Sequence, residues 1–482
     1  MNKRTAKLLS LLGIFILLLG GYGIISSFVS QEDSEDTTAS TMTVAAIEAE
    51  EVDQLRWTYD EETISLSRQD DTWVNTEDDT MPIDQDKVST MLSALSSIVS
   101  NRKLDTPEDL SIYGLDTATC EITVTEQDGT EISFSIGDYN SVSGCYYLMY
   151  NDTIYLVDET LLSAYSVTTQ DLIAYEELPD LSDTQSMTIT SGDNTLTLIH
   201  CTENMEEFTY TDSYTWFLEE DDNYTPLSTS AVSSLKSTIA EMEFLSCIAW
   251  NADAEVLEET GLSNPAATVT VQYTETDSET ETETSHTLTI LLGNYVDESC
   301  YVMLEDSDLI YTVDASVADT LLLLQASSLL PNDICLVTED SVDTLVITID
   351  GETSEINMTH ETETAEDGTS GVTTTSYFDN VELDPESVQS AFDMLNSMSA
   401  QGTADSTVSQ RDTVLELTFY RNTDTFQELT LTFSTYDSAS YLVTFQGKSR
   451  LLADKSDVRS LMDLLESALV SEAAGSSVEG ST

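Results

Sequence analysis

The stretch SIYGLDTATCEITVTEQDGTEISFSIGDYNSVSGCYYLMYNDTIYLVDETLLSAY, residues 111–165, determines which fold the chain can adopt. It opens with a tight Tyr-Gly-Leu-Asp turn and continues as short segments in which apolar and polar residues alternate. A two-residue alternation is typical of β-strands with one buried face, and the intervening Gln127-Asp128-Gly129 is a usual hairpin turn. We therefore predict an antiparallel meander with strands at residues 121–125, 132–136, 146–150 and 153–157.

The same pattern recurs twice further along the chain. A recognisable copy covers residues 260–323, and a weaker copy precedes the C-terminus. Its expected strands are at 268–273, 287–292, 301–304 and 309–313 in the second copy, and at 414–420, 428–433, 441–445 and 450–452 in the third. Each meander ends in an aspartate (Asp158, Asp314, Asp454) before a Leu-rich helical stretch. We interpret these aspartates as helix N-caps and not as a catalytic set.

A second repeated block, a short strand pair followed by a helix, precedes each meander. Good N-cap residues (Asp84, Ser228, Asp384) lie four positions before the first apolar helix residue, and Pro385 is suited to the first helical position. Apolar residues at i, i+3, i+7 and i+10 predict one buried helix face. These positions are Val88, Met91, Leu95 and Ile98; Val232, Leu235, Ile239 and Met242; and Val388, Ala391, Leu395 and Met398.

These repeats predict an α+β protein: an N-terminal transmembrane helix followed by two or three tandem antiparallel-sheet-plus-helix repeat units. We place repeat unit 1 at residues 52–180, repeat unit 2 at 181–330 and a divergent repeat unit 3 at 331–470. Residues 471–482 are expected to form a disordered tail. Two acidic, low-complexity inserts, residues 274–285 and 359–376, are expected to be mobile loops.

The N-terminal segment reads as a membrane anchor. Residues 1–7 are basic, and residues 8–29 contain no charge over a length sufficient to cross a bilayer. Acidic residues follow, so we expect a cytoplasmic N-terminus, a single-pass anchor within residues 1–29 and an extracytoplasmic body. A cleaved signal peptide is the competing interpretation. Residues 30–51, acidic and rich in Ser and Thr, are expected to be a disordered stalk.

The charge of the chain limits its partners. It has 90 acidic and 15 basic residues, and Lys236 is the only basic residue between Asp105 and Gln410. Such a surface repels nucleic acids and anionic lipids. The shortage of lysine also argues against nucleotide binding. The charge suits high solubility, cations or a basic partner.

The motifs that would indicate a reaction are missing. The three histidines lack metal-ligand spacing, the six cysteines form no Cys-x-x-Cys, and no nucleophile elbow or phosphate loop occurs. We therefore predict no catalytic, cofactor-binding or metal-binding residues, and we expect the histidines to be surface or strand residues. Cys145 and Cys300 occupy equivalent repeat positions and suggest packing, whereas spacing leaves open whether Cys201 pairs with Cys247. Trp73, Trp216 and the paired tyrosines are expected in the core or on a sheet face more than on a sugar platform.

Taken together, the pattern resembles the bacterial family catalogued as domain of unknown function 4340. The resemblance covers most of residues 55–325 and rests on the N-terminal apolar segment and the Trp-containing strand before a helix. Its sequence motifs are Tyr113-Gly114-Leu115-Asp116, Ile136-Gly137-Asp138, Cys145-Tyr146-Tyr147 and Ile154-Tyr155-Leu156-Val157. The second copy matches more loosely, through Thr260-Gly261-Leu262, Leu292-Gly293-Asn294 and Ile310-Tyr311-Thr312-Val313. The family's usual proline after the turn is Ala118 here, although Pro265 is present in the second copy.

The resemblance implies a membrane-tethered protein that faces the exterior and is often encoded beside ABC-type export systems. It supplies no catalytic or ligand residues. We expect a non-enzymatic auxiliary or scaffold subunit of an ABC-type export or cell-envelope assembly, with a transporter or other envelope proteins as partners. The alternative is an extracellular polymer- or cation-binding module, and a hydrolase is a distant third.

Overall fold

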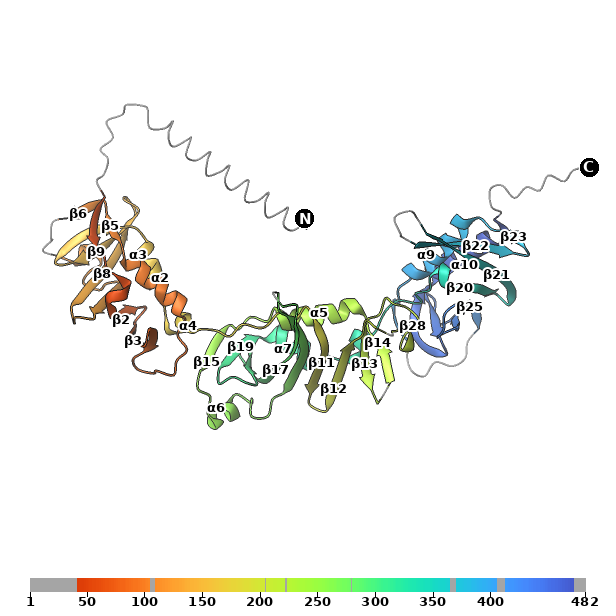
Figure 1. Ribbon diagram of the computed structural model, residues 1–482, viewed down its shortest axis with the longest axis horizontal. Coiled ribbons are helices and arrows are strands. Elements are labelled where there is room, and N and C mark those ends of the chain that lie inside the picture. Colours follow the sequence, from red (N-terminus) through yellow and green to blue (C-terminus); the bar gives the residue numbers. More distant parts are fainter. Residues whose placement is uncertain are drawn as a thin grey trace, which may run out of the picture. The chain divides into compact units, whose positions relative to one another are not determined.

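A computed structural model describes residues 41–104, 109–203, 205–221, 223–278, 280–364, 370–404 and 412–471 (Figure 1). The chain divides into two compact units, residues 1–174 and residues 175–482. The first unit contains one large antiparallel sheet and the second contains two. Three large antiparallel sheets with helices packed against them confirm the predicted α+β class.

The first unit is built on an eight-stranded sheet with the order β4-β3-β2-β7-β8-β9-β10-β6. Its strands are β2 (Val52–Tyr59), β3 (Glu62–Gln69), β4 (Thr72–Asn75), β6 (Arg102–Leu104), β7 (Cys120–Glu126), β8 (Glu131–Asn140), β9 (Cys145–Tyr150) and β10 (Thr153–Val157). Its helical segments are η1 (Ala49–Glu51), α2 (Gln85–Leu95), η2 (Ser111–Tyr113), α3 (Thr160–Tyr165) and α4 (Thr169–Leu172). The indole Nε1 of the buried Trp57 donates to the Val167 carbonyl at 2.9 Å, which ties the sheet to the segment between α3 and α4.

The second sheet has nine strands in the order β14-β13-β12-β11-β16-β17-β18-β19-β15. They are β11 (Thr184–Ser191), β12 (Asn194–His200), β13 (Trp216–Glu220), β14 (Asn223–Pro226), β15 (Ser246–Ala249), β16 (Ala267–Thr276), β17 (Glu283–Val296), β18 (Ser299–Leu304) and β19 (Ile310–Asp314). The helical segments are η3 (Met205–Glu207), α5 (Thr229–Ala240), α6 (Ala254–Glu259), α7 (Ala315–Leu322) and α8 (Ala326–Leu329). Lys236 on α5 donates through Nζ to the Ser182 carbonyl at 3.0 Å.

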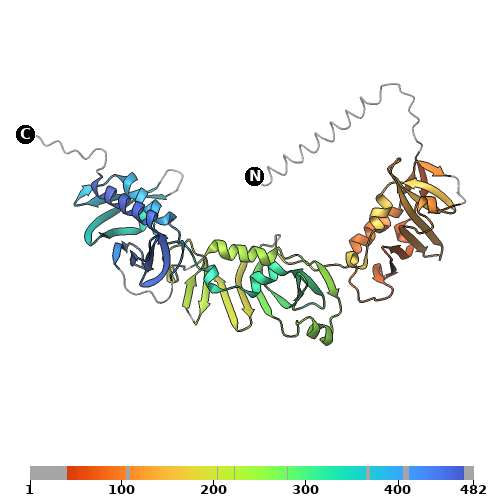
Figure 2. The same ribbon diagram turned by 180° about the vertical axis from the view of Figure 1, so that it is seen from behind.

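The third sheet also has nine strands, in the order β23-β22-β21-β20-β25-β26-β27-β28-β24. They are β20 (Val342–Ile349), β21 (Glu352–Thr364), β22 (Ser370–Phe378), β23 (Val381–Glu382), β24 (Gly402–Thr403), β25 (Thr413–Arg421), β26 (Glu428–Thr435), β27 (Ser440–Phe445) and β28 (Lys448–Asp454). The helical segments are η4 (Glu339–Ser341), α9 (Pro385–Ser397) and α10 (Lys455–Val470). Helices α9 and α10 lie side by side over this sheet (Figures 1 and 2), and their apolar faces join its core.

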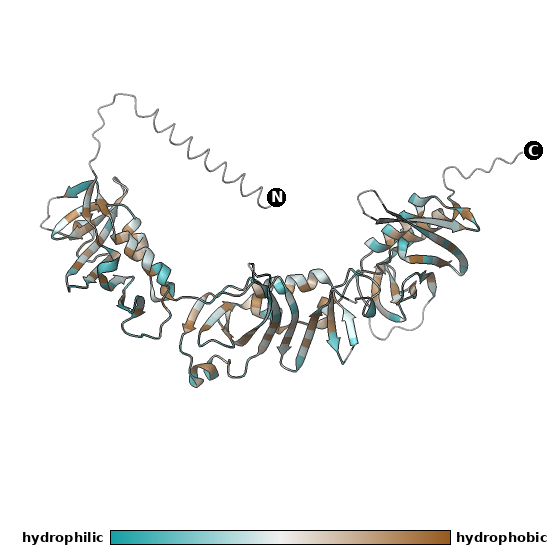
Figure 3. Cartoon of the chain, viewed as in Figure 1, coloured by the Kyte–Doolittle hydropathy of each residue, from teal (hydrophilic) through white to brown (hydrophobic). Residues whose placement is uncertain are grey.

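All three sheets follow one plan. The first strand of each copy (β2, β11, β20) pairs with the first strand of its meander (β7, β16, β25), and the rest of the meander continues outward. Apolar residues alternate with polar residues along the strands (Figure 3), and the apolar ones are buried. The third copy has the same strand order as the second, although it lacks the turn motif.

The helices follow the predicted pattern with one exception. Residues at the first three predicted positions are buried in α2, α5 and α9. Each of these helices ends before the fourth position, so Ile98 belongs to β5 (Ile98–Ser100), and Met242 and Met398 follow the helix. All three side chains are buried although they lie outside the helix. An apolar residue shortly after a helix end still faces the core, because the chain turns back there. The i+10 assignment to the helix was therefore wrong.

Two further expectations were wrong in part. Residues 30–40 of the predicted stalk (30–51) lie outside the described residues, but its described part is ordered: β1 (Met42–Ala45) pairs with β5 (Ile98–Ser100), and Ile47 is buried. The pairing of β1 with β5 and the burial of Ile47 therefore order this segment in spite of its acidic composition. Hairpin strands extend into both acidic inserts, since β16 pairs with β17 as far as Thr276 and Glu283, and β21 pairs with β22 as far as Thr364 and Ser370. The β-branched threonines that recur in these inserts favour extended structure.

Among the described residues, none of the helices is both long enough and apolar enough to span a membrane. The predicted anchor at residues 8–29 and all but one residue of the predicted tail lie outside those residues.

Candidate functional site

The repeated glycine motifs form a contact between a turn and a bulged strand, which we call the turn–bulge contact. In the first unit, Gly114 has a left-handed φ of 63°, and a Cβ added there would lie 2.5 Å from the Asp138 side chain. A Cβ added at Gly137 would lie 2.1 Å from the Tyr113 carbonyl oxygen. Gly137 lies where the β8–β9 register shifts, between Ile136 and Tyr139. Two motifs that are separated in the sequence therefore fit together only because both carry glycine.

The second sheet repeats this contact. Gly261 has a φ of 78° and faces the Asn294 side chain, while a Cβ at Gly293 would lie 2.3 Å from the Thr260 carbonyl oxygen. The Asn294 backbone N–H donates to that same oxygen at 2.8 Å, and its side-chain amide donates to the Glu259 carbonyl at 3.2 Å. The glycines thus allow the turn and the bulged strand to approach each other, and the motif positions backbone.

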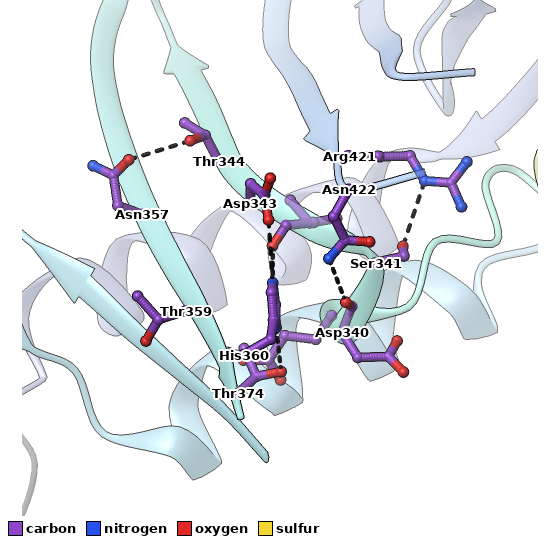
Figure 4. A network of polar contacts seen from close by, with 12 residues as sticks. Asp340, Ser341, Asp343, Thr344, Asn357, Thr359, His360, Thr374, Arg421 and Asn422 are labelled. Carbon is purple, nitrogen blue, oxygen red and sulfur yellow. Dashed lines mark hydrogen bonds and ion pairs between the residues drawn. The ribbon is translucent and has the colours of Figure 1, made fainter. Parts of the chain in front are cut away.

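The three histidines are strand residues, as expected. His200 stacks on Trp216, and His286 stacks on Tyr273. His360 lies in a polar network at the start of β20 (Figure 4). Its Nδ1 is 3.0 Å from the Thr374 hydroxyl, and its Nε2 is 3.0 Å from the Val342 carbonyl oxygen and 3.6 Å from the Asp343 carboxylate. Both ring nitrogens are occupied by the protein's own groups.

A second part of Figure 4 connects η4 to the end of β25. Asn422 donates through Nδ2 to the Asp340 carbonyl at 2.9 Å, and Arg421 lies with Nε 3.4 Å from the Ser341 hydroxyl. The hydrogen bonds of Asn422 and Arg421 therefore fix the segment before β20.

Within the described residues, no group of three or more His, Cys, Asp or Glu side chains could hold a metal ion.

Two of the three aspartates that end the meanders are N-cap residues, as predicted, whereas the prediction was wrong for Asp158 by one residue. Asp314 and Asp454 accept from Ser316 and Ser456, and these hydrogen bonds lower the pKa of both carboxyls. Asp158 lies one residue before the N-cap of α3 and accepts from the Thr160 N–H at 3.0 Å. Separate helix starts thus account for all three.

All six cysteines are free, and five of them are buried. Burial raises the pKa of Cys120 and Cys335 to about 12, and that of Cys300 to about 11. Cys145 and Cys300, which occupy equivalent positions, are both buried, as expected for packing residues. Trp73 and Trp216 are also in the core, 6% and 5% exposed. These residues therefore serve packing.

The unit of residues 175–482 contains an apolar cavity of about 390 Å³. Its walls come from the segment after η3, from β14, from the connection at residues 330–334 and from the β27–β28 hairpin. Aromatic side chains dominate the lining: Phe208, Tyr210, Tyr214, Tyr224, Phe426 and Phe445. Tyr210 packs against Phe445 with ring centroids 5.0 Å apart.

The hydroxyls of Tyr210 and Tyr214, which line the aromatic cavity, are already hydrogen-bonded within the protein. The Tyr210 hydroxyl accepts from the Leu336 N–H at 3.1 Å, and the Tyr214 hydroxyl donates to the Asp333 carboxylate at 3.1 Å. Burial raises the pKa of both tyrosines far above the ordinary value, so both hydroxyls stay protonated. Neutral, hydrogen-bonded phenols make poor nucleophiles or bases, whereas their ring faces can contact an apolar group.

A second, more polar hollow of about 450 Å³ adjoins the aromatic cavity, because Thr209 and Tyr210 line both. Its described lining residues include three acids, Glu206, Asp212 and Asp424, and one cation, Arg421. The Thr425 hydroxyl donates to the Glu206 carbonyl at 2.6 Å and holds the two walls together. We call this feature the acidic hollow.

Sequence reasoning missed the aromatic cavity. The segment FTYTDSYTW, residues 208–216, carries an unusual density of aromatic residues between β12 and β13. Their spacing by multiples of two is that of a strand, although only Trp216 lies in one. The density of aromatic residues was the signal available in the sequence, but the facing residues from β27 and β28 lie more than 200 positions away.

The fold thus defines a class: proteins built from tandem antiparallel α+β sheets, of which the first two here contain a turn–bulge contact. The chain matches the family described as "Domain of unknown function (DUF4340)" over residues 73–207 and 216–416, which is more than half of its length. The chain therefore belongs to this family. Neither a curated protein nor a solved structure gives a significant match.

Proposed function

We propose that the protein is a non-enzymatic, membrane-tethered extracytoplasmic subunit that assists or scaffolds an ABC-type export or cell-envelope assembly. The uncharged apolar run at residues 8–29 supports the tether, since its length matches the thickness of a bilayer. Basic residues before it and acidic residues after it support a single pass with the body outside.

The aromatic cavity is the observation that carries this proposal. Its walls are largely apolar, and the hydroxyls of Tyr210 and Tyr214 are already committed to structural hydrogen bonds. A concave surface of this kind suits the burial of another molecule's apolar group. An auxiliary subunit has to bind its partner without catalysing a reaction, and such a surface is suited to that task.

The proposal is tested by crosslinking in intact cells, followed by detergent extraction, capture through a C-terminal tag and mass spectrometry. We expect to recover a membrane transporter subunit or another envelope protein, compared with a control chain that carries the same tag on an unrelated single-pass anchor. Recovery of wall polymer alone would refute the proposal and favour a polymer-binding module. Recovery of nothing beyond the control would also refute it.

A further inference from the structure

We propose that the aromatic cavity is the docking site for the protein partner, and that its occupant is an extracytoplasmic segment with one aromatic or large aliphatic side chain flanked by lysine or arginine. This inference rests on the proposed function, because it assumes that a protein partner exists. It adds where that partner binds and which chemistry is recognised.

The size and lining of the cavity specify the apolar part of the occupant. Its volume of about 390 Å³ falls at the lower end of the roughly 300–1,000 Å³ that is usual for binding pockets. Interfaces between proteins draw most of their affinity from a few anchor side chains held in such pockets. The rings of Phe208, Tyr224 and Phe445 offer faces against which an aromatic or aliphatic anchor packs.

The acidic hollow specifies the basic part. A chain that places its anchor in the aromatic cavity and continues past Thr209 and Tyr210 enters the acidic hollow. There it meets Glu206, Asp212 and Asp424, opposed by the single cation Arg421. The complementary charge is positive, and the excess of 90 acidic over 15 basic residues in the whole chain steers a basic segment in the same direction.

The same charge argues against a lipid as the occupant. An acyl chain would satisfy the apolar walls, but an anionic headgroup placed in the acidic hollow would face Asp212 and Asp424. Like charges brought together at an interface are unfavourable. We therefore assign the cavity to a peptide segment, and a lipid adduct is one of the outcomes of the test.

The experiment places a photocrosslinking amino acid at Thr225, which lines the cavity, in the full-length chain expressed in intact cells. The matched control carries the same amino acid at Thr270, a half-exposed threonine of β16 in the same sheet that is not part of the cavity lining. After irradiation, the crosslinked segment is identified by mass spectrometry. We expect the Thr225 probe, and not the Thr270 probe, to capture a segment with an apolar anchor and flanking basic residues.

A charge variant then tests the acidic hollow. With the probe kept at Thr225, the combined change Glu206→Gln, Asp212→Asn and Asp424→Asn removes three negative charges at nearly constant volume. We expect the yield of the crosslinked product to fall by about fivefold or more, because interfacial charges set the rate of encounter. The control, Asp297→Asn, Glu298→Gln and Asp306→Asn, removes three exposed charges outside both hollows and is expected to change the yield less than about twofold.

The results separate the two proposals. If tag-based capture recovers a partner but Thr225 crosslinks to no protein, to a lipid or to a segment without basic residues, the docking site is refuted while the proposed function stands. Equal losses in the two charge variants would refute the role of the acidic hollow. If capture recovers no partner, the proposed function itself fails. Circular dichroism of each variant verifies that it is folded.

Discussion

Replacing Gly293 with alanine should disrupt the second turn–bulge contact. The new Cβ would lie 2.3 Å from the Thr260 carbonyl oxygen, a separation that real Cβ atoms essentially never show. The carbonyl must therefore retreat by several tenths of an ångström. That movement stretches the hydrogen bond from the Asn294 N–H, which is now 2.8 Å long.

The size of the effect follows from these two costs. Overpacking in a tight region costs about 1–3 kcal/mol, and loss of one backbone hydrogen bond costs about 1 kcal/mol. We expect Gly293→Ala to lower the free energy of unfolding by about 2–4 kcal/mol. With a urea dependence of about 2 kcal/mol per molar, the midpoint should fall by about 1–2 M.

The assay is urea unfolding of the full chain in mild detergent, followed by tryptophan fluorescence and circular dichroism. The control is Gly371→Ala in β22, where an added Cβ meets nothing within 4 Å and φ is not left-handed. This control should be neutral or slightly stabilising, by less than about 1 kcal/mol. If both variants unfold at the same urea concentration, the turn–bulge contact is not the rigid joint that its geometry indicates.

Three further outcomes are expected. Trp57→Phe leaves the Val167 carbonyl without its donor and should lower the unfolding free energy by about 2–4 kcal/mol, measured by urea unfolding. The Asp314 carboxyl should titrate below its ordinary range by carbon NMR. Because its folded pKa is lowered, its stabilising contribution is present above the unfolded pKa and is lost as the pH falls through the folded pKa. With a disulfide reagent at pH 8, Cys335 should react only on unfolding, since burial raises its pKa to about 12. Half-exposed Cys201 should react first, as a fast kinetic phase, and Cys201→Ser should remove that phase.

The meander strands were predictable because two local signals agreed. Along residues 153–157, apolar alternation and flanking turn residues bound the strand at both ends, and β10 has those same bounds. The helix ends were less predictable, because Ile98 keeps the helical spacing while its backbone has already entered β5. Spacing alone cannot distinguish a residue that is buried by a helix from one that is buried just after it.

The hairpin extensions and the aromatic cavity were not predicted from the sequence, for two different reasons. The Thr-Glu repeat of residues 274–285 was predicted to be a loop from its acidic composition, although threonine favours strands and β16 pairs with β17 as far as Thr276 and Glu283. The aromatic cavity depends on side chains from segments far apart in the chain, such as Tyr210 and Phe445. Their meeting follows from how the second and third sheets are connected, which local pattern does not reveal.

The hydrogen bond from Lys236 to the Ser182 carbonyl bears on how proteases can cleave the chain. Proteases that cleave after lysine or arginine find one such residue between Lys103 and Arg411, and it lies within helix α5 with its ammonium group bonded to the chain. Cleavage there requires that the helix unwind first. The stretch between Lys103 and Arg411 would therefore resist such proteases for as long as α5 stays folded.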